Sequence, residues 1–419
     1  MFSILKNAWK IPDLRKKILY TVLLLIVFRL GSHIPLPFID RSILPSLFGG
    51  NNTLFGLANI ISGNALSQAT IFAMSITPYI NSSIIMQLLT VAIPALERLS
   101  KEGEEGKKKI AKITRVVTIV LAFVQASGLF IAVADSSVKS NFAAFFVVVL
   151  TLTAGTAFLM WLGEQINEKG VGNGISMIIF AGIISGAPTA IMSLIAGAKD
   201  VMSWVIIVSV LLVTLIVIGF IVLMNNAERR IPVQYAKRVV GRKMYGGQST
   251  HVPIKVAMAG VMPIIFAVSI LAFPATIAQM FGGATTGFWA GVIRVLSPGS
   301  IWYSIIYFIL IILFTFFYTE IQFNPVEIAN NMKTNGGFVP GLRPGKPTSD
   351  FIRMVLNRIT MIGAVFIALI AVLPTLLSHI NSAFAFGGSS LIIVVGVAIE
   401  TVKQIESQML MRHYKGFLE

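Results

Sequence analysis

The sequence predicts an all-α polytopic membrane protein with ten transmembrane helices in two inverted five-helix halves. Three observations support this fold class. Of the 419 residues, 56% are hydrophobic and 12% are charged, which is about half the charged fraction of an ordinary soluble domain. Ten long apolar stretches run through the chain. Finally, 28 of the 33 Lys and Arg residues fall into alternate gaps between these stretches, as they do in the cytoplasmic loops of membrane proteins.

Each apolar stretch is long enough to cross a bilayer as a helix, which takes about 20 residues. The predicted spans cover residues 18–34, 72–95, 114–134, 142–162, 175–196, 203–224, 256–281, 301–320, 353–378 and 386–404. The positive gaps are the odd-numbered ones, and ten spans return the chain to its starting side. We therefore expect a multi-pass protein of the cell membrane with both termini in the cytoplasm.

The first span begins like a signal peptide, with Arg15, Lys16 and Lys17 before an apolar run, but no small-residue cleavage site follows it. We therefore expect this span to be retained. The segment before it carries Trp9 and Ile11 among basic residues. Such a segment is expected to lie along the membrane surface.

The spans divide into an N-terminal half, residues 1–197, and a C-terminal half, residues 198–419. Five spans per half give the second half the opposite orientation to the first. Inverted repeats of this kind place a site or path between the halves, near the middle of the membrane. The halves share no convincing sequence identity, so the repeat is predicted from the span count.

One long segment, residues 35–71, is expected on the outer side. Within it, Leu54–Leu66 is too short to span the membrane and is interrupted by glycine, serine and asparagine. Short or irregular pieces at membrane depth persist only where protein covers them or where they line a water-filled cavity. Two interpretations remain open, an interfacial helix and a helix that folds back into the mouth of a cavity.

Two cytoplasmic loops are longer than ordinary connections. In the loop 225–255, basic residues alternate with β-prone ones around Gly246-Gly247, which predicts a hairpin with Lys and Arg at its tip. The loop 321–352 predicts a short helix and then a Gly/Pro-rich tip around Arg343. These loops are either simply solvated or together form a docking surface, which their length and two basic tips favour.

Residue patterns for metal, cofactor or catalytic chemistry are missing from the sequence. There is no cysteine, and the four histidines have no ligand spacing. Gly341–Thr348 has three residues between its glycines and a proline after the lysine, so it predicts a turn and not a phosphate-binding loop. We expect no metal, no cofactor and no enzymatic activity.

The middles of the spans are nearly free of ionisable residues, since Arg29 lies near an outer end and Glu320, Glu400 and Lys403 near inner ends. Coupled transporters usually need such residues at membrane depth. A neutral interior with small polar side chains and many isoleucines favours a path that selects by a narrow apolar constriction.

Six long strings of the sequence closely resemble the bacterial SecY family, in the right order and across essentially the whole chain. They are Phe72–Leu89, Gly170–Gly182, Tyr235–Val256, Ala259–Thr276, Phe323–Gly345 and Phe386–Val395. The resemblance implies the central subunit of the protein-conducting translocation channel. This would be a clamshell of two halves around an hourglass pore, with a plug helix and a lateral gate made by spans two, three, seven and eight.

Residue by residue, the resemblance assigns three groups. The pore ring would comprise Ile80, Ile84, Ile179, Ile265, Ser269 and Ile393. The plug would lie within residues 54–66, at Phe55, Gly56, Leu57, Ala58, Asn59, Ile60, Ile61, Ser62, Gly63 and Asn64. Contacts to a ribosome or motor would come from Arg230, Lys237, Arg238, Arg242, Lys243 and Arg343.

The partners implied by the resemblance are SecE- and SecG-like small membrane subunits, the SecA motor ATPase, the ribosome, signal sequences with their nascent polypeptides, and membrane lipid. Lys and Arg tips suit the phosphates of ribosomal RNA and equally suit acidic patches on a motor. With no nucleotide site in the sequence, the energy for transport would come from a partner.

The sequence thus predicts a passive, gated conduit for unfolded polypeptide in the bacterial cytoplasmic membrane. The main alternative is a secondary transporter for a small solute on the same inverted-repeat plan, which would need a buried ionisable cluster. A scaffold or receptor without a conduit is a third possibility, and it would leave the Leu54–Leu66 segment unexplained.

Overall fold

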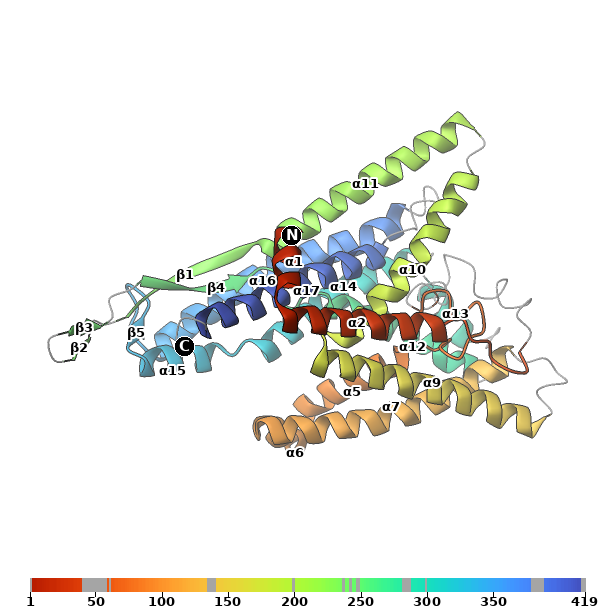
Figure 1. The fold of residues 1–419 in the computed structure, drawn as a ribbon, viewed down its shortest axis with the longest axis horizontal. Coiled ribbons are helices and arrows are strands. Elements are labelled where there is room, and N and C mark those ends of the chain that lie inside the picture. Colours follow the sequence, from red (N-terminus) through yellow and green to blue (C-terminus); the bar gives the residue numbers. More distant parts are fainter. Residues whose placement is uncertain are drawn as a thin grey trace.

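The structure is a computed structural model that describes residues 2–39, 59, 62–133, 141–197, 200–235, 238–240, 243–245, 249–280, 288–297, 300–377 and 388–415. Each predicted span contains a helix in these residues, which confirms the all-α prediction. The helices are α2 (Pro12–Gly31), α5 (Thr77–Ala92), α7 (Glu104–Val133), α9 (Phe142–Lys169), α10 (Gly174–Ala196), α11 (Val201–Asn226), α12 (Met262–Met280), α14 (Ile301–Gln322), α16 (Lys346–Leu377) and α17 (Gly388–Lys415). They gather into one bundle (Figure 1). A shorter helix, α13 (Phe288–Val295), lies between α12 and α14 in the sequence.

By length and composition alone, five helical segments among the described residues qualify as membrane spans. The bent pair of α5 and α6 (Pro94–Lys101) makes a sixth. The apolar stretches of α10 and α12 are shorter, and α2 carries basic residues near both of its ends. Length explains why α10 and α12 are not counted, and charge explains α2, although all three helices occupy the predicted positions.

Span two is shorter than predicted. Residues 72–76 form turns, and α5 begins only at Thr77, with Pro78 in its first turn. Pro94 explains where α5 ends, because a residue before proline is driven into extended geometry and Ile93 has φ −106° and ψ 114°. The chain then turns by 100° into α6.

The loop 225–255 forms a hairpin, as predicted. β1 (Glu228–Tyr235) pairs antiparallel with β4 (Ser249–Lys255). At the tip, β2 (Arg238–Val240) pairs with β3 (Lys243–Tyr245), and Val240 lies opposite Lys243. These three-residue strands belong to the predicted hairpin, while the predicted turn at Gly246-Gly247 lies outside the described residues.

The loop 321–352 joins the same sheet. It contains the predicted short helix, α15 (Pro325–Thr334), which Asn324 caps by accepting hydrogen bonds from the amides of the first turn. β5 (Gly337–Phe338) then pairs with β1, so the strand order is β4-β1-β5. Residues of both loops and of α16 share one apolar cluster: Ile231, Val233, Ile254, Met332, Val339, Ile352 and Leu356.

The N-terminal segment is a short helix, α1 (Phe2–Lys10), that meets α2 at a steep angle (Figure 1). Ala8 and Leu14 are buried in a small cluster with Val171 and Ile405. Trp9 is half exposed. This amphipathic helix is therefore packed against α2 and α17.

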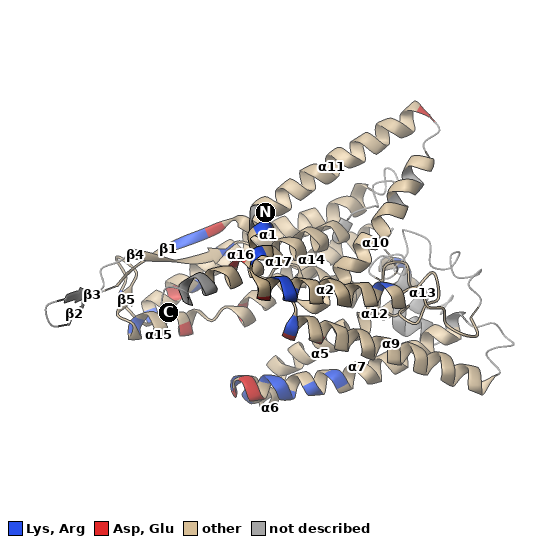
Figure 2. Cartoon of the chain, in the orientation of Figure 1, with Lys and Arg blue, Asp and Glu red and all other residues tan. Residues whose placement is uncertain are grey.

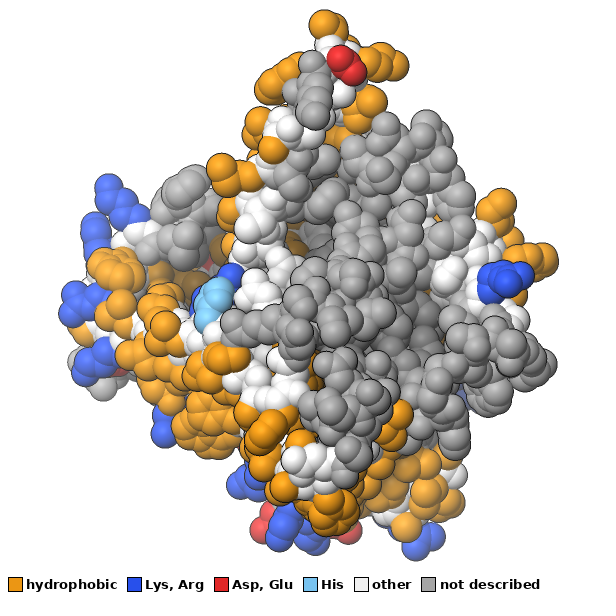
Figure 3. All heavy atoms as spheres, turned by 90° about the vertical axis from the view of Figure 1, so that its right-hand side faces the viewer, with side chains coloured by type: hydrophobic (Ala, Val, Ile, Leu, Met, Phe, Trp, Pro, Cys, Tyr) orange, Lys and Arg blue, Asp and Glu red, His pale blue; other side chains and the backbone are white. Residues whose placement is uncertain are grey.

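Charge is distributed unevenly along the bundle. Lys and Arg gather at the end that carries both chain termini, the sheet and α6 (Figure 2). Figure 3 looks onto the opposite end, where the described side chains are largely hydrophobic around a broad area that is not described. In the described part of the chain, the buried polar side chains are all Thr, Ser or Asn. The charge-poor interior expected from the sequence is thus present.

Candidate pore ring and docking platform

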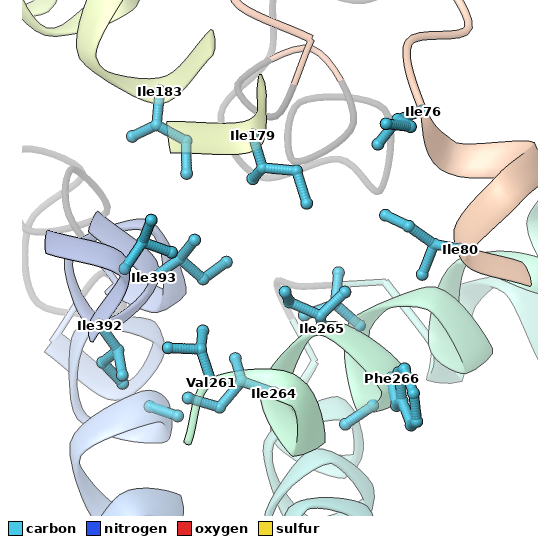
Figure 4. Close-up of a cluster of buried hydrophobic side chains, with 14 of the residues drawn as sticks. Ile76, Ile80, Ile179, Ile183, Val261, Ile264, Ile265, Phe266, Ile392 and Ile393 are labelled. Atoms are coloured by element: carbon cyan, nitrogen blue, oxygen red, sulfur yellow. The ribbon is translucent and has the colours of Figure 1, made fainter. Parts of the chain in front are cut away.

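The six predicted ring residues are all buried. α5 contributes Ile80 and Ile84, α10 contributes Ile179, α12 contributes Ile265 and Ser269, and α17 contributes Ile393. The five isoleucines belong to one apolar cluster at the centre of the bundle. Figure 4 shows side chains of this cluster converging from four helices on a common centre. The structure therefore brings the predicted ring together between the two halves of the chain.

Further apolar residues extend the ring along its axis. Ile76, Ile183 and Val261 each lie four residues from a ring isoleucine, Ile183 on α10 and the other two in the turns directly before α5 and α12. All three are buried in the same cluster, and Figure 4 shows them around the same centre. The resemblance did not mark them, but the spacing of four residues from Ile80, Ile179 and Ile265 was a usable signal.

A close approach also lies three residues after Ile393. A Cβ placed on Gly396 of α17 would overlap the side chain of Val261, which lies in the turn before α12. The absence of a side chain at Gly396 therefore leaves room for Val261, which belongs to the same apolar cluster as Ile393 and Ile265. Small residues commonly allow such close packing within membranes.

The four predicted lateral-gate helices lie next to one another. α12 contacts α5 and α7 of the first half, as well as α14 of its own half. Within the first pair, the Ser82 hydroxyl donates a hydrogen bond to the Thr114 carbonyl at 2.9 Å. Within the second pair, Phe266 meets Phe314 edge to face, with 5.9 Å between ring centroids. The helices within each pair are thus held to each other. The boundary between the pair α5–α7 and the pair α12–α14 is here called the seam.

The predicted plug falls largely outside the described residues, which include Asn59, Ser62, Gly63 and Asn64 but not Phe55, Gly56, Leu57, Ala58, Ile60 or Ile61. The described part is closely bonded. The Asn59 side-chain oxygen accepts a hydrogen bond from the Ser67 amide at 2.9 Å, and its carbonyl accepts one from the Ser62 hydroxyl at 2.9 Å. Residues 62–69 form turns, so the predicted helical character does not extend to Leu66.

The predicted docking residues occupy two neighbouring parts of the sheet region. Arg230 is exposed on β1 and forms an ion pair with Glu228 at 2.8 Å. Arg238 and Lys243 lie on β2 and β3 at the hairpin tip, while Lys237 and Arg242 fall outside the described residues. Arg343 is exposed in the turn after β5. Because β5 pairs with β1, the two basic loops are joined, and β1–β5 are here called the platform.

A residue that sequence reasoning assigned only to snorkelling also contacts the plug region. An Arg29 guanidinium nitrogen donates a hydrogen bond to the Gly63 carbonyl at 3.2 Å. Its position near the outer end of the first span was visible in the sequence, but its partner 34 residues away was not.

Comparison with known proteins agrees with these features. The SecY family model matches residues 70–402. The protein translocase subunit SecY of Streptomyces coelicolor is 45% identical over 437 residues, with 100% of both chains covered. The subunit of the same name from Escherichia coli is 45% identical over 417 residues, covering 97% of this chain and 94% of that one.

Solved structures share the fold. A protein-conducting channel superposes with a TM-score of 0.68 at 19% identity, covering 94% of this chain and 92% of the other. Sec61 in a canine ribosome–channel complex from the endoplasmic reticulum superposes with a TM-score of 0.63 at 18% identity and the same coverage. At these identities the likeness speaks for the architecture alone.

Proposed function

This chain belongs to the SecY family, and we propose that its isoleucine ring is the closed constriction of a channel for unfolded polypeptide. The channel moves secretory chains across the cytoplasmic membrane and releases membrane segments sideways into the lipid. The single observation that carries the proposal is the convergence of buried isoleucines from α5, α10, α12 and α17 on one centre, between the two halves (Figure 4). Family membership leaves the small-solute transporter alternative without support.

The ring works through the cost of wetting an apolar constriction. A narrow ring of isoleucines offers water and ions no hydrogen-bonding partner, so it resists their passage while it stays narrow. An arriving polypeptide displaces the side chains and takes their place. Ser269 makes one position of the ring slightly polar, yet its side chain is 7% exposed. A single buried hydroxyl is a small departure from an apolar seal.

The seam between α5–α7 and α12–α14 is the proposed lateral gate. Side chains along this seam are largely apolar, so an apolar signal helix can form the same kinds of contact that hold it closed. Binding of such a helix shifts the population toward the open state by the difference in its affinity for the two states. Within the lipid, the signal helix and the gate helices compete for the same contacts, and the closeness of packing decides between them because lipid removes the hydrophobic effect.

The platform of β1–β5 is proposed to dock the ribosome or the SecA motor. Arg230, Arg238, Lys243 and Arg343 supply its positive charge in the described residues, and Lys237 and Arg242 would add to it. The ribosome is proposed as a partner because Sec61, which shares this fold, occurs in a ribosome–channel complex. SecE- and SecG-like subunits are further proposed partners. We propose that this chain is not itself an ATPase and that a partner supplies the energy for transport.

The chain is a multi-pass membrane protein of the bacterial membrane, and both of its termini are proposed to lie in the cytoplasm. Both termini lie at the end of the bundle that carries the sheet (Figure 1). The same end gathers the Lys and Arg side chains (Figure 2), and positive charge marks the cytoplasmic side.

Ion conductance tests the ring. Ile84→Lys or Ile393→Lys places a charge in the constriction, so the resting ion leak of reconstituted channels should rise by about tenfold or more. The control Ile362→Lys puts the same change on α16, where the side chain is 64% exposed on the bundle surface, and should leave the leak unchanged. Unchanged resting conductance in both ring variants contradicts the ring assignment.

A further inference from the structure

The described end of the candidate plug and the residues after it, here called the stem (residues 62–71), are held in place by a contact from α2. Arg29 is half-buried near the end of α2, and its guanidinium donates hydrogen bonds to the Gly63 carbonyl at 3.2 Å and the Ser32 hydroxyl at 3.4 Å. A hydrogen bond from a permanently charged donor is stronger than one between neutral groups. It joins the first span to a segment more than thirty residues away.

Gly63 packs so closely against α10 that a side chain would not fit there; this contact is here called the seat. A Cβ built on it would lie 2.8 Å from the Ser185 hydroxyl and 3.0 Å from the Gly182 Cα. Its φ of +67° is also a conformation that glycine adopts without the penalty paid by other residues. Gly63 is therefore held between α10 on one side and the Arg29 guanidinium on its carbonyl.

The stem has a backbone that needs such support. Asn64 and Ala69 both have positive φ, at 68° and 44°. Non-glycine residues avoid this region and stay there only where surrounding contacts over-determine it. The far end of the stem is paired with the chain after α2, since the Leu36 amide donates to the Ala69 carbonyl at 2.8 Å. Without these contacts the stem would relax to another conformation.

We propose that Arg29 is a positioning residue that latches the stem against α10 while the channel is closed. The latch rests on the proposed function, because a latch of the closed state presupposes a channel. When the channel opens, the Gly63 carbonyl leaves Arg29, whose long side chain can then reach the water at the membrane surface. A merely local role, capping the end of α2 through Ser32, is the competing explanation.

A thiol-accessibility measurement separates the two. The chain contains no cysteine, so Ala65→Cys places one thiol in the stem, at a position that is 1% exposed. In purified, reconstituted channels carrying Ala65→Cys, the rate of labelling by a water-soluble maleimide reports how often the stem is released. Arg29→Gln should raise this rate about fivefold or more, the scale expected for losing one hydrogen bond to a charged donor. Arg29→Lys, which keeps a charged donor, should give a smaller rise.

Two controls remove other effects of the substitution. Arg294→Gln removes another arginine from the exposed end of a helix far along the chain, α13, and should not change the labelling rate. Ser32→Ala removes the local contact but leaves the bond to Gly63, and should also label like the parent. A labelling rate for Arg29→Gln equal to that of the parent overturns the latch, as does an equal rise in Ser32→Ala.

A second variant covers the case in which Arg29→Gln fails to fold. Gly63→Ala disturbs the seat without touching Arg29, and it should raise the labelling rate as well. The ion leak of the same samples separates the latch from the proposed function. Faster labelling supports the latch whether or not the leak rises, whereas the pore-ring assignment is decided by the leak of Ile84→Lys and Ile393→Lys.

Discussion

Gln234 of β1 lies opposite Phe338 of β5, and through this pair two loops separated by about a hundred residues become one platform. The neighbouring pair joins Tyr235 to Gly337. A Cβ on Gly337 would lie 2.9 Å from a Tyr235 ring carbon. The arrangement of the basic residues therefore depends on a glycine that carries no charge itself.

Gly337→Val tests this dependence. The added side chain should displace β5 and with it the Arg343 turn, so binding of ribosomes or motor to the reconstituted channel should weaken about tenfold, although every basic residue remains. Gly219→Ala on α11, where an added Cβ meets nothing within 4 Å, is the matched control. Equal binding by Gly337→Val and the parent would show that the two loops act separately.

Charge reversal on the platform should reveal its electrostatic contribution. Arg343→Glu is expected to weaken ribosome binding and to lower the slope of log affinity against log salt by about one or more, since phosphate contacts release counterions. Arg230→Glu should act less strongly, because Glu228 already pairs with Arg230 at 2.8 Å. Lys107→Glu, an exposed change in the first turn of α7, controls for net charge. If the Arg343→Glu variant and the parent bind ribosomes with the same affinity and the same salt slope, the docking role of Arg343 is contradicted.

The stability cost of replacing a helix glycine should depend on how closely another backbone approaches it. A Cβ on Gly174 would overlap the Gly163 carbonyl, where α10 starts against α9. Because backbone atoms cannot move aside as a side chain can, Gly174→Ala should destabilise the protein by about 2 kcal/mol. Gly219→Ala should cost nothing by comparison. Thermal unfolding of the purified variants in detergent checks the difference, and a Tm for Gly174→Ala at or above the parent's would refute it.

Local sequence patterns predicted most helices because a membrane span has a simple requirement, a long apolar run between polar ends. The same requirement explains the error at span two. Residues 72–76 are as apolar as a helix, yet they form turns covered by protein, with Phe72 and Ile76 both buried. Apolar composition reports burial, and it does not distinguish a buried turn from a buried helix.

Features that depend on contacts between distant segments were the ones missed. The register of β2 and β3 joins two strands of three residues each, which are too short to carry a pattern that would fix it. The β1–β5 pairing involves a two-residue strand with no pattern of its own. The contact between Arg29 and Gly63 joins two segments whose proximity only the fold creates.

The ring residues were assigned by resemblance and not by physics, because isoleucine is common throughout the spans. The structure adds that the assigned residues are buried in one cluster and converge from four helices (Figure 4).

Site-specific crosslinking of a stalled secretory chain tests the central claim most directly. A photoreactive residue at position 84, in the ring, is compared with one at position 362, which is 64% exposed on α16. The conduit account predicts strong crosslinks from position 84, dependent on a functional signal sequence, and few from position 362. Crosslinks from position 362 without any from position 84 would contradict the account and favour a receptor that never admits the chain to its centre.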